Sequence, residues 1–306
     1  MPPLPRSGHQ STIAADGYEA TIASIGASLR SLTFEGRDLA VPFDADAVRP
    51  AYRGATLAPW PNRIVDGMYA FGGEDHRLAL TEPERGHALH GLLAWVDWTV
   101  TATASDHVTL EATIPAQVGY PFAVRVQTEF AVSGAGLSQT VTATNIGADA
   151  APWGTGPHPY LWAGDGGVDA WSFELRAEEV LLVTEDRLSP VRVGAVELHP
   201  EFDFRTERAI GDTFIDHAFT SVARDAEGFA TVTVRAADGH GVAVVWDESC
   251  PWVQIHTADT PLPETHRIGL AVEPMTCPPD AFNSRVDLVV LEPGQSHSAG
   301  WRIAAV

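Results

Sequence analysis

Alternating hydrophobic and polar residues recur along most of the chain, in short runs that turn residues separate. Between residues 122 and 132 nearly every second side chain is apolar, and residues 108–114 repeat the pattern. A period of two residues is typical of a strand with one buried face. No segment shows a sustained period of 3.6 residues. The pattern therefore predicts strands with few short helical turns, which we expect near residues 178–179 and 279–282.

Turn signals separate several pairs of predicted strands. Residues 237–241 and 134–136 are glycine-rich and each lies between two alternating runs. Residues 292–295 separate the apolar run 288–291 from residues 298–303, which predicts another hairpin. Many short strands broken by turns are typical of an all-β sandwich or barrel. Because no long polar linker interrupts the chain of 306 residues, we expect a single domain spanning all of it.

The composition limits the classes of partner and location. Nineteen Lys and Arg residues against 40 Asp and Glu residues give a net charge of -21. Contacts to phosphate supply much of the affinity for nucleic acids, so nucleic-acid and anionic-membrane partners are not expected. No apolar run reaches the ~20 residues that span a bilayer. Residues 1–6 lack the apolar segment of a signal peptide, which leads us to expect a cytoplasmic protein.

Familiar catalytic motifs are missing from the sequence. It contains no Gly-x-Ser-x-Gly elbow, no phosphate-binding glycine loop and no dinucleotide fingerprint. Cys250 and Cys277 are its two cysteines, and neither has an adjacent base. One disulfide between them is conceivable, but we expect two buried free thiols.

Glu273 occupies the most informative position. It follows the apolar run 268–272 and precedes Pro274, at the inner end of a predicted buried strand. Burial of an unpaired carboxylate is costly, so such a group has a partner or a raised pKa. His90 and His158 likewise have Gly or Pro neighbours. One carboxylate and two histidines are suited to proton transfer near neutral pH.

Both histidines also have structural interpretations. His90 lies in a leucine-rich segment, where a core histidine is common, and His158 could be a turn histidine. The prolines on both sides of His158 lack N–H groups, which excludes a central strand. His87 lies three residues before His90 and could suggest a metal site. Residues i and i+3 of a strand point to opposite faces, however, and no Glu or Cys completes a ligand set, so we expect no metal.

Polar and aromatic side chains in other segments could contact a ligand. Arg63 offers a planar fork of donors, and the flat apolar face of Trp60 suits the C–H face of a sugar ring. A surface ion pair and a core position are the respective alternatives. Asp216 interrupts an apolar segment and needs a partner, which a structural hydrogen bond could equally supply. Gln254 alternates within a predicted strand and faces either a pocket or solvent.

Taken in order, these segments resemble the aldose 1-epimerase (mutarotase) family over roughly residues 15–305. The matching motifs are Asn62-Arg63-Ile64, Leu89-His90-Gly91, His158-Pro159-Tyr160, Asp216-His217, Val253-Gln254-Ile255 and Val272-Glu273-Pro274. The resemblance implies a large antiparallel β-sandwich, often called a supersandwich, with an open cleft. It also implies cofactor-free interconversion of the α and β anomers of an aldose.

Residue roles follow from the same resemblance. Glu273 would remove the proton of the C1 hydroxyl, His158 would protonate the ring oxygen, and His90 would assist. Arg63, Asp216 and Gln254 would hold sugar hydroxyls. The remaining candidate substrate contacts are Asn62, Trp60 and Tyr160. The expected partner is therefore a small sugar, an aldohexose, bound by a monomer or a homodimer.

Departures from the better-known galactose mutarotases affect the expected substrate. Leu92 stands where a second glycine usually follows the His-Gly pair, and the loop 81–86 lacks their usual asparagine. These features resemble a less characterised branch that includes mutarotases proposed for sulfoquinovose, a sulfonated glucose. An anionic sugar would need cations, for which Arg53, Arg63 and Arg85 are the candidates.

Two other function classes stay open at this point. A non-catalytic carbohydrate-binding sandwich could keep the cleft without turnover, although pure binding does not need an acid–base set. A glycosidase or lyase on a related sandwich could use Asp216 with Glu273, since glycosidases place two carboxylates across the scissile bond.

Overall fold

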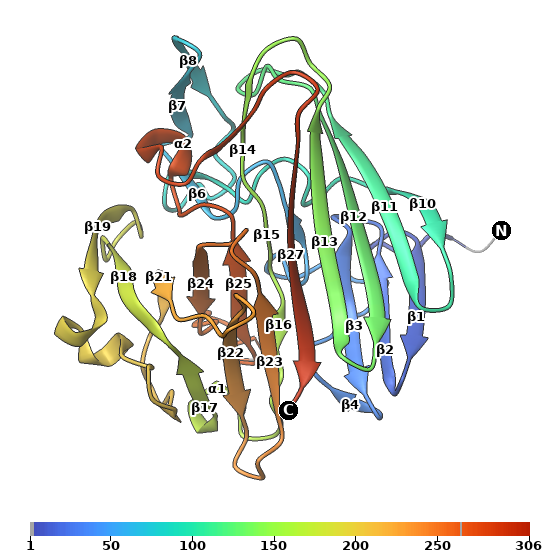
Figure 1. Ribbon diagram of the computed structural model, residues 1–306, viewed down its shortest axis with the longest axis vertical. Helices are drawn as coiled ribbons and strands as arrows, with labels where there is room; N and C mark the ends of the chain where they lie inside the picture. The colour runs from blue at the N-terminus through green and yellow to red at the C-terminus, as the bar shows by residue number, and fades with distance from the viewer. Residues whose placement is uncertain (1–2, 264) are drawn as a thin grey trace.

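The computed structural model describes residues 3–263 and 265–306, and antiparallel strands make up most of its regular structure (Figure 1). The largest sheet has nine strands, whose lengths follow the alternating patterns. β12, for example, buries its even-numbered residues from Val124 to Val132. The order in the sheet is β10 (Thr99–Thr103), β11 (His107–Ile114), β12 (Val124–Ser133), β13 (Gly136–Asn145), β27 (Ser296–Ala305), β23 (Gly241–Trp246), β22 (Ala230–Arg235), β17 (Ser172–Leu175) and β20 (Arg208–Ala209).

A second sheet of six strands provides the platform of the candidate site. Two of its inner strands have no exposed residue, and one of them, β25 (Leu270–Met275), is buried throughout. The order is β16 (Tyr160–Leu161), β25 (Leu270–Met275), β24 (Trp252–His256), β21 (Asp216–Val222), β18 (Ala177–Val183) and β19 (Pro190–Ala195).

Smaller sheets complete the sandwich. A four-stranded sheet packs against the long strands β12 and β13 (blue in Figure 1). It consists of β1 (Gln10–Ala15), β2 (Tyr18–Ala23), β3 (Ser28–Phe34) and β4 (Arg37–Asp38). The two-stranded pairs are β14 (Ala151–Trp153) with β26 (Val289–Leu291), β15 (Gly156–Pro157) with β5 (Thr56–Leu57), β6 (Arg63–Val65) with β9 (His87–Leu89), and β7 (Met68–Phe71) with β8 (Glu74–Arg77).

Helical structure among the described residues is short. It consists of α1 (Gly167–Ala170), α2 (Ala281–Ser284) and two 3₁₀ turns, Val196–Leu198 and Pro200–Phe202. The turn expected near 279–282 is confirmed by α2. The turn expected near 178–179 is wrong, because these residues lie in β18, which pairs with both β19 and β21. Among the described residues, no helix combines the length and apolarity needed to cross a membrane.

The sequence-based expectation of an all-β antiparallel sandwich is confirmed. The hairpins around 134–136 and 237–241 are also confirmed, as β12–β13 and β22–β23. The hairpin expected around 292–295 is wrong, since β26 pairs with β14 while β27 pairs with β13 and β23. Both cysteines are buried and free, as expected.

Candidate active site

Three neighbouring strands of the six-stranded sheet place polar side chains on one face. Gln254 on β24 lies directly opposite Glu273 on β25, and His256 on β24 lies opposite Asp216 on β21. Directly opposed residues of an antiparallel pair share a face, as do residues two apart on one strand. The strand register therefore gathers these four side chains at the floor of one cavity.

The cavity has a volume of about 310 Å³ and lies between this sheet and the loops around β5, β6 and β9. Within the described residues it brings together every site residue expected from the sequence except Trp60. Those lining it are Asn62, Arg63, His90, His158, Tyr160, Asp216, Gln254 and Glu273.

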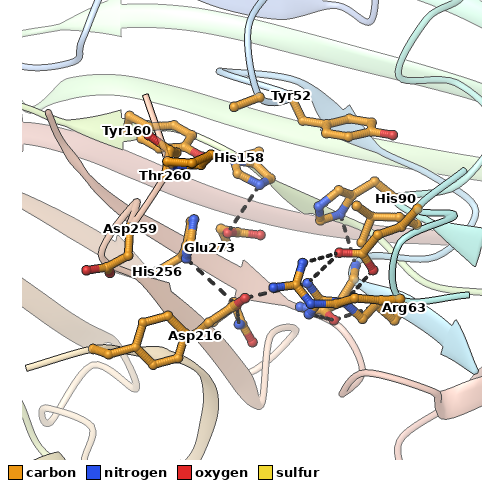
Figure 2. Close-up of a pocket in the computed structure, with 18 residues that line it drawn as sticks. Tyr52, Arg63, His90, His158, Tyr160, Asp216, His256, Asp259, Thr260 and Glu273 are labelled. Carbon is orange, nitrogen blue, oxygen red and sulfur yellow. Dashed lines mark hydrogen bonds and ion pairs between the residues drawn. The ribbon is translucent and has the colours of Figure 1, made fainter. Parts of the chain in front are cut away.

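His158 and Glu273 face each other in the cavity (Figure 2). The distance from His158 Nε2 to Glu273 Oε1 is 3.6 Å, and the two side chains are only 6% and 2% exposed. Burial raises the pKa of Glu273 well above its ordinary value, and nearby Asp216 adds to the increase. Burial, reinforced by His256, lowers the pKa of His158 to about 3. Burial therefore works against the charged form of both groups.

His90 presents an N–H group to the cavity. Its Nδ1 accepts a hydrogen bond from the Asn62 backbone N–H at 3.2 Å. A neutral imidazole that accepts at Nδ1 carries its proton on Nε2. Burial lowers the pKa of His90 well below its usual value, so the ring stays neutral. Its centroid lies 4.9 Å from that of His158.

The backbone conformation at position 91, directly after His90, requires a glycine. Its φ is +77°, and a Cβ atom there would lie 2.1 Å from the carbonyl oxygen of Ala58. Only glycine permits so close an approach of two backbones. The Gly91 position thereby fixes the path on which His90, itself at φ 61°, enters the cavity.

Arg63 is held by two carboxylates. Its Nε and Nη2 donate to Glu82 at 2.7 and 3.0 Å, and Nη2 also lies 3.5 Å from Asp216 Oδ2. Gln254 Nε2 donates to Asp216 Oδ1 at 2.6 Å. Burial alone would lower the pKa of Arg63 and raise that of Asp216, but the opposite charges shift both the other way, so both stay ionised.

Glu82 and His256 also line the cavity, and no local pattern selected Glu82. Glu82 lies in the loop noted for its departure from the family pattern, and Arg85 of that loop contacts it at 2.9 Å. His256 Nδ1 is 3.9 Å from Asp216 Oδ1 and has no hydrogen-bond partner. Alternation along the strand allowed His256 to face either the cavity or solvent, and only the register with β21 decides.

Trp60 lies in the core rather than in the cavity. It is 3% exposed, its Nε1 donates to the Ala88 carbonyl at 3.3 Å, and its ring packs edge-on against Phe282. The sugar contact expected of Trp60 does not fit this position. The aromatic residues that do line the cavity are Tyr52, Tyr160 and Phe214.

His87 has a structural role. Its Nδ1 accepts from the Asp66 N–H at 3.3 Å, which leaves Nε2 to donate to the Arg187 carbonyl at 3.0 Å. Arg187 in turn donates to the Arg85 carbonyl at 2.8 Å and so holds the loop that carries Glu82. In residues 3–263 and 265–306, no cluster of three or more potential ligands could hold a metal ion.

Comparison with known proteins identifies the family that the sequence matches. Residues 9–304 match the family described as Aldose 1-epimerase. The uncharacterized protein YihR of Escherichia coli K12 is 38% identical over 292 residues, covering 95% of this chain and 91% of that protein.

Solved structures share the fold at low sequence identity. The GalM/aldose epimerase homologue of C. elegans has a TM-score of 0.85 at 20% identity, covering 97% of this chain and all of that one. Galactose 1-epimerase from Lactobacillus acidophilus has a TM-score of 0.80 at 18% identity, covering 97% and 94% of the two chains.

Proposed function

Because the chain belongs to the aldose 1-epimerase family, we propose that it interconverts the α and β anomers of a hexose without a cofactor. The single observation that carries the proposal is the buried pair of His158 and Glu273, 3.6 Å apart in a polar cavity. A base and an acid this close can serve two oxygens bonded to the same carbon, which are O1 and O5 at C1 of a pyranose.

The reaction needs one proton removed and one supplied. The Glu273 carboxylate takes the proton of the C1 hydroxyl while the His158 imidazolium protonates O5, the C1–O5 bond breaks, and the open aldehyde forms. Rotation about C1–C2 and the reverse transfers close the ring as the other anomer. Both groups return to their starting states, so no proton is consumed overall.

The directions of the two pKa shifts favour the form in which Glu273 carries the proton and His158 is neutral, because burial disfavours charge on either partner. Transfer of this proton to His158 would create the carboxylate and imidazolium that the mechanism uses. Hydrogen bonds from sugar hydroxyls would stabilise the charged form, and His90 Nε2–H is a donor suited to the ring oxygen region.

Hydroxyl recognition would fall to Arg63, Asp216 and Gln254. Asp216 is fixed by Gln254 Nε2 and Arg63, while Gln254 Oε1 is buried without a partner and is free to accept from a hydroxyl. Asn62 and Tyr160 are further proposed contacts on the wall. Such positioning suits a reaction that is nearly thermoneutral and needs orientation more than binding energy.

A sulfonated hexose is a narrower proposal for the substrate, and one observation favours it. Arg85 lines the cavity and donates through Nη1 to Glu82 at 2.9 Å, while its Nε has no hydrogen-bond partner. Arg63 is already engaged by two carboxylates, and Arg53 donates to the Pro42 carbonyl at 2.9 Å beside the Tyr160 ring. A greater loss of activity toward sulfoquinovose than toward D-glucose in Arg85→Gln would support this narrower proposal; equal losses would contradict it.

The decisive experiment follows anomerisation of freshly dissolved α-D-glucose, α-D-galactose and sulfoquinovose by time-resolved NMR. Wild-type protein should accelerate at least one, and Glu273→Gln should lose on the order of 10²-fold or more of that rate. Binding without acceleration would favour a non-catalytic carbohydrate-binding protein. Release of nitrophenol from a nitrophenyl glycoside would instead favour the glycosidase alternative, in which Asp216 and Glu273 share the chemistry.

A further inference from the structure

We propose that Tyr52 forms the aromatic wall against which the sugar ring packs at its reacting end, an assignment that rests on the proposed function. Tyr52 lies in the loop before β5 and lines the cavity. Its ring centroid is 4.7 Å from that of His90 and 6.4 Å from that of His158 (Figure 2). Tyr52 therefore borders both histidines of the proposed acid–base set.

The backbone at Tyr52 adopts a conformation that side chains ordinarily avoid. Ala51 and Tyr52 have φ values of 46° and 54°, in the left-handed region. Two turn hydrogen bonds hold them there: Arg53 N–H donates to the Pro50 carbonyl and Ala55 N–H to the Tyr52 carbonyl, each at 2.9 Å. Residues in this region persist where their surroundings fix them, and they occur often at ligand sites.

Main-chain hydrogen bonds connect this turn directly to His158. Gly54 N–H donates to the His158 carbonyl at 2.7 Å, and His158 N–H donates to the Ala55 carbonyl at 3.0 Å. A Cβ atom on Gly54 would lie 2.1 Å from the Leu29 carbonyl oxygen, so the turn also packs tightly on β3. The position of Tyr52 relative to His158 is therefore set by the backbone as well as by ring contacts.

The ring of Tyr52 has support on one side and access to the cavity. Trp95 lies 5.5 Å from it, centroid to centroid, and the Arg49 guanidinium covers Trp95 at 4.4 Å. Tyr52 is half-buried, whereas Tyr160, stacked against His158 at 5.3 Å, is buried. Of the two tyrosines beside His158, Tyr52 is thus the one with more surface left for a ligand.

The chemistry of a pyranose explains what this surface would contact. Its hydroxyls lie mostly around the rim, while C–H groups form apolar patches on the ring faces. The cavity offers charged and amide groups for the hydroxyls, namely Arg63, Asp216 and Gln254. An aromatic face carries partial negative charge and attracts C–H groups, which those polar residues cannot accommodate. Tyr52 would supply the apolar surface that Trp60, buried in the core, cannot.

The test compares Tyr52→Phe with Tyr52→Asn in the anomerisation assay. Asparagine tolerates positive φ, so Tyr52→Asn removes the ring while keeping the turn. We expect Tyr52→Asn to raise KM by at least about 10-fold while kcat stays within about threefold of the wild-type value. This is the pattern for loss of an interaction that is equally strong in the bound substrate and in the transition state. Tyr52→Phe, which keeps the aromatic ring, should raise KM by less than Tyr52→Asn does. Phe229→Asn, which removes a partly exposed aromatic ring outside the cavity, is the matched control and should match wild type.

Other outcomes would overturn the assignment. An unchanged KM in Tyr52→Asn, or a fall in kcat alone, would mean that the ring does not contact the sugar. If Tyr52→Asn fails to fold, Tyr52→Gly provides the same comparison, because glycine adopts positive φ without strain. Saturation-transfer NMR of sugar binding separates this proposal from the proposed function. If sugar binding weakens in Tyr52→Asn, the role of Tyr52 as the aromatic wall is supported even when wild-type protein does not accelerate anomerisation. Absence of both binding and acceleration in wild type would overturn both proposals.

Discussion

Glu82 and Arg63 form a two-point ion pair in the cavity wall, with Glu82 Oε2 2.7 Å from Arg63 Nε and Oε1 3.0 Å from Nη2. Both side chains are less than 10% exposed. The pair fixes the plane of the guanidinium, because a carboxylate that binds two N–H groups leaves no freedom of rotation. The one Arg63 nitrogen that also reaches Asp216 is thereby directed across the cavity.

Glu82→Gln should weaken both sugar binding and the fold. Removing one partner of a buried ion pair typically costs about 3–5 kcal/mol, and we expect the lower end because Asp216 still contacts Arg63. Urea denaturation would measure the loss in free energy of unfolding. Glu178→Gln, which breaks the exposed pair with Arg205, should leave that free energy unchanged. Equal effects of the two changes would contradict a structural role for Glu82.

His158 should make the protein less stable in mild acid. Its folded pKa is depressed to about 3 from an ordinary 6.5, so the unfolded chain binds the proton first. The stability contributed by the neutral ring is fully present above pH 6.5 and is lost as pH falls toward about 3. Denaturation of wild type and His158→Gln between pH 7 and 4 should give a shallower pH dependence for the variant.

Glu273→Gln should reduce a loss of stability that occurs as the pH rises, whereas the loss due to His158 occurs as the pH falls. The folded pKa of Glu273 is raised, so its stabilising contribution is present below its ordinary value of 4.5 and declines as pH rises toward the folded pKa. We expect the variant to lose less stability than wild type when the pH is raised from about 4.5. Parallel stability curves for the two proteins would show that the carboxyl group is not held protonated.

Gly91→Ala should displace His90. A Cβ atom would overlap the Ala58 carbonyl oxygen, and φ is +77°. Backbone strain of this kind costs on the order of 1–3 kcal/mol, and relief of the overlap must move the histidine. Thermal denaturation should show the loss, and anomerisation should slow more than in Gly239→Ala. Gly239 has a similar φ of +88° but open space around it, so it controls for strain without overlap.

The two thiols should be unreactive in the folded protein. Cys250 and Cys277 are fully buried, and burial raises the pKa of each to about 12. Reactivity requires the thiolate and access to it. A colorimetric thiol reagent should therefore label neither cysteine under native conditions and both in denaturant. Labelling of the native protein would reveal local opening around β24 or β25.

Much of the fold could be predicted from local pattern, and the exceptions have physical causes. Alternation and glycine turns located β11, β12 and the hairpins β12–β13 and β22–β23, because these features are local. Residues 178–179 look helical by composition, yet pairing of β18 on both edges decides their conformation. The pairing of β26 with β14 joins segments far apart in the sequence, which no local turn signal encodes.

The site residues that could be predicted are those with an unusual local sequence. Glu273 and His158 stood out because charge or proline is unusual inside apolar segments. Trp60 was placed in the site because its type suits a sugar, but residue type does not reveal on which side of a rigid segment a ring lies. Tyr52 and Glu82 lacked any local signal, since long-range contacts alone bring them to the cavity.

The burial of both partners in the His158–Glu273 pair has a consequence for selectivity. Burial works against charge on either group, so forming the ionised pair is costly when no substrate is bound. We expect ionisation to become more favourable once sugar hydroxyls supply hydrogen bonds that stabilise the two charges. The proposed proton transfer would then be confined to the time during which a substrate occupies the cavity.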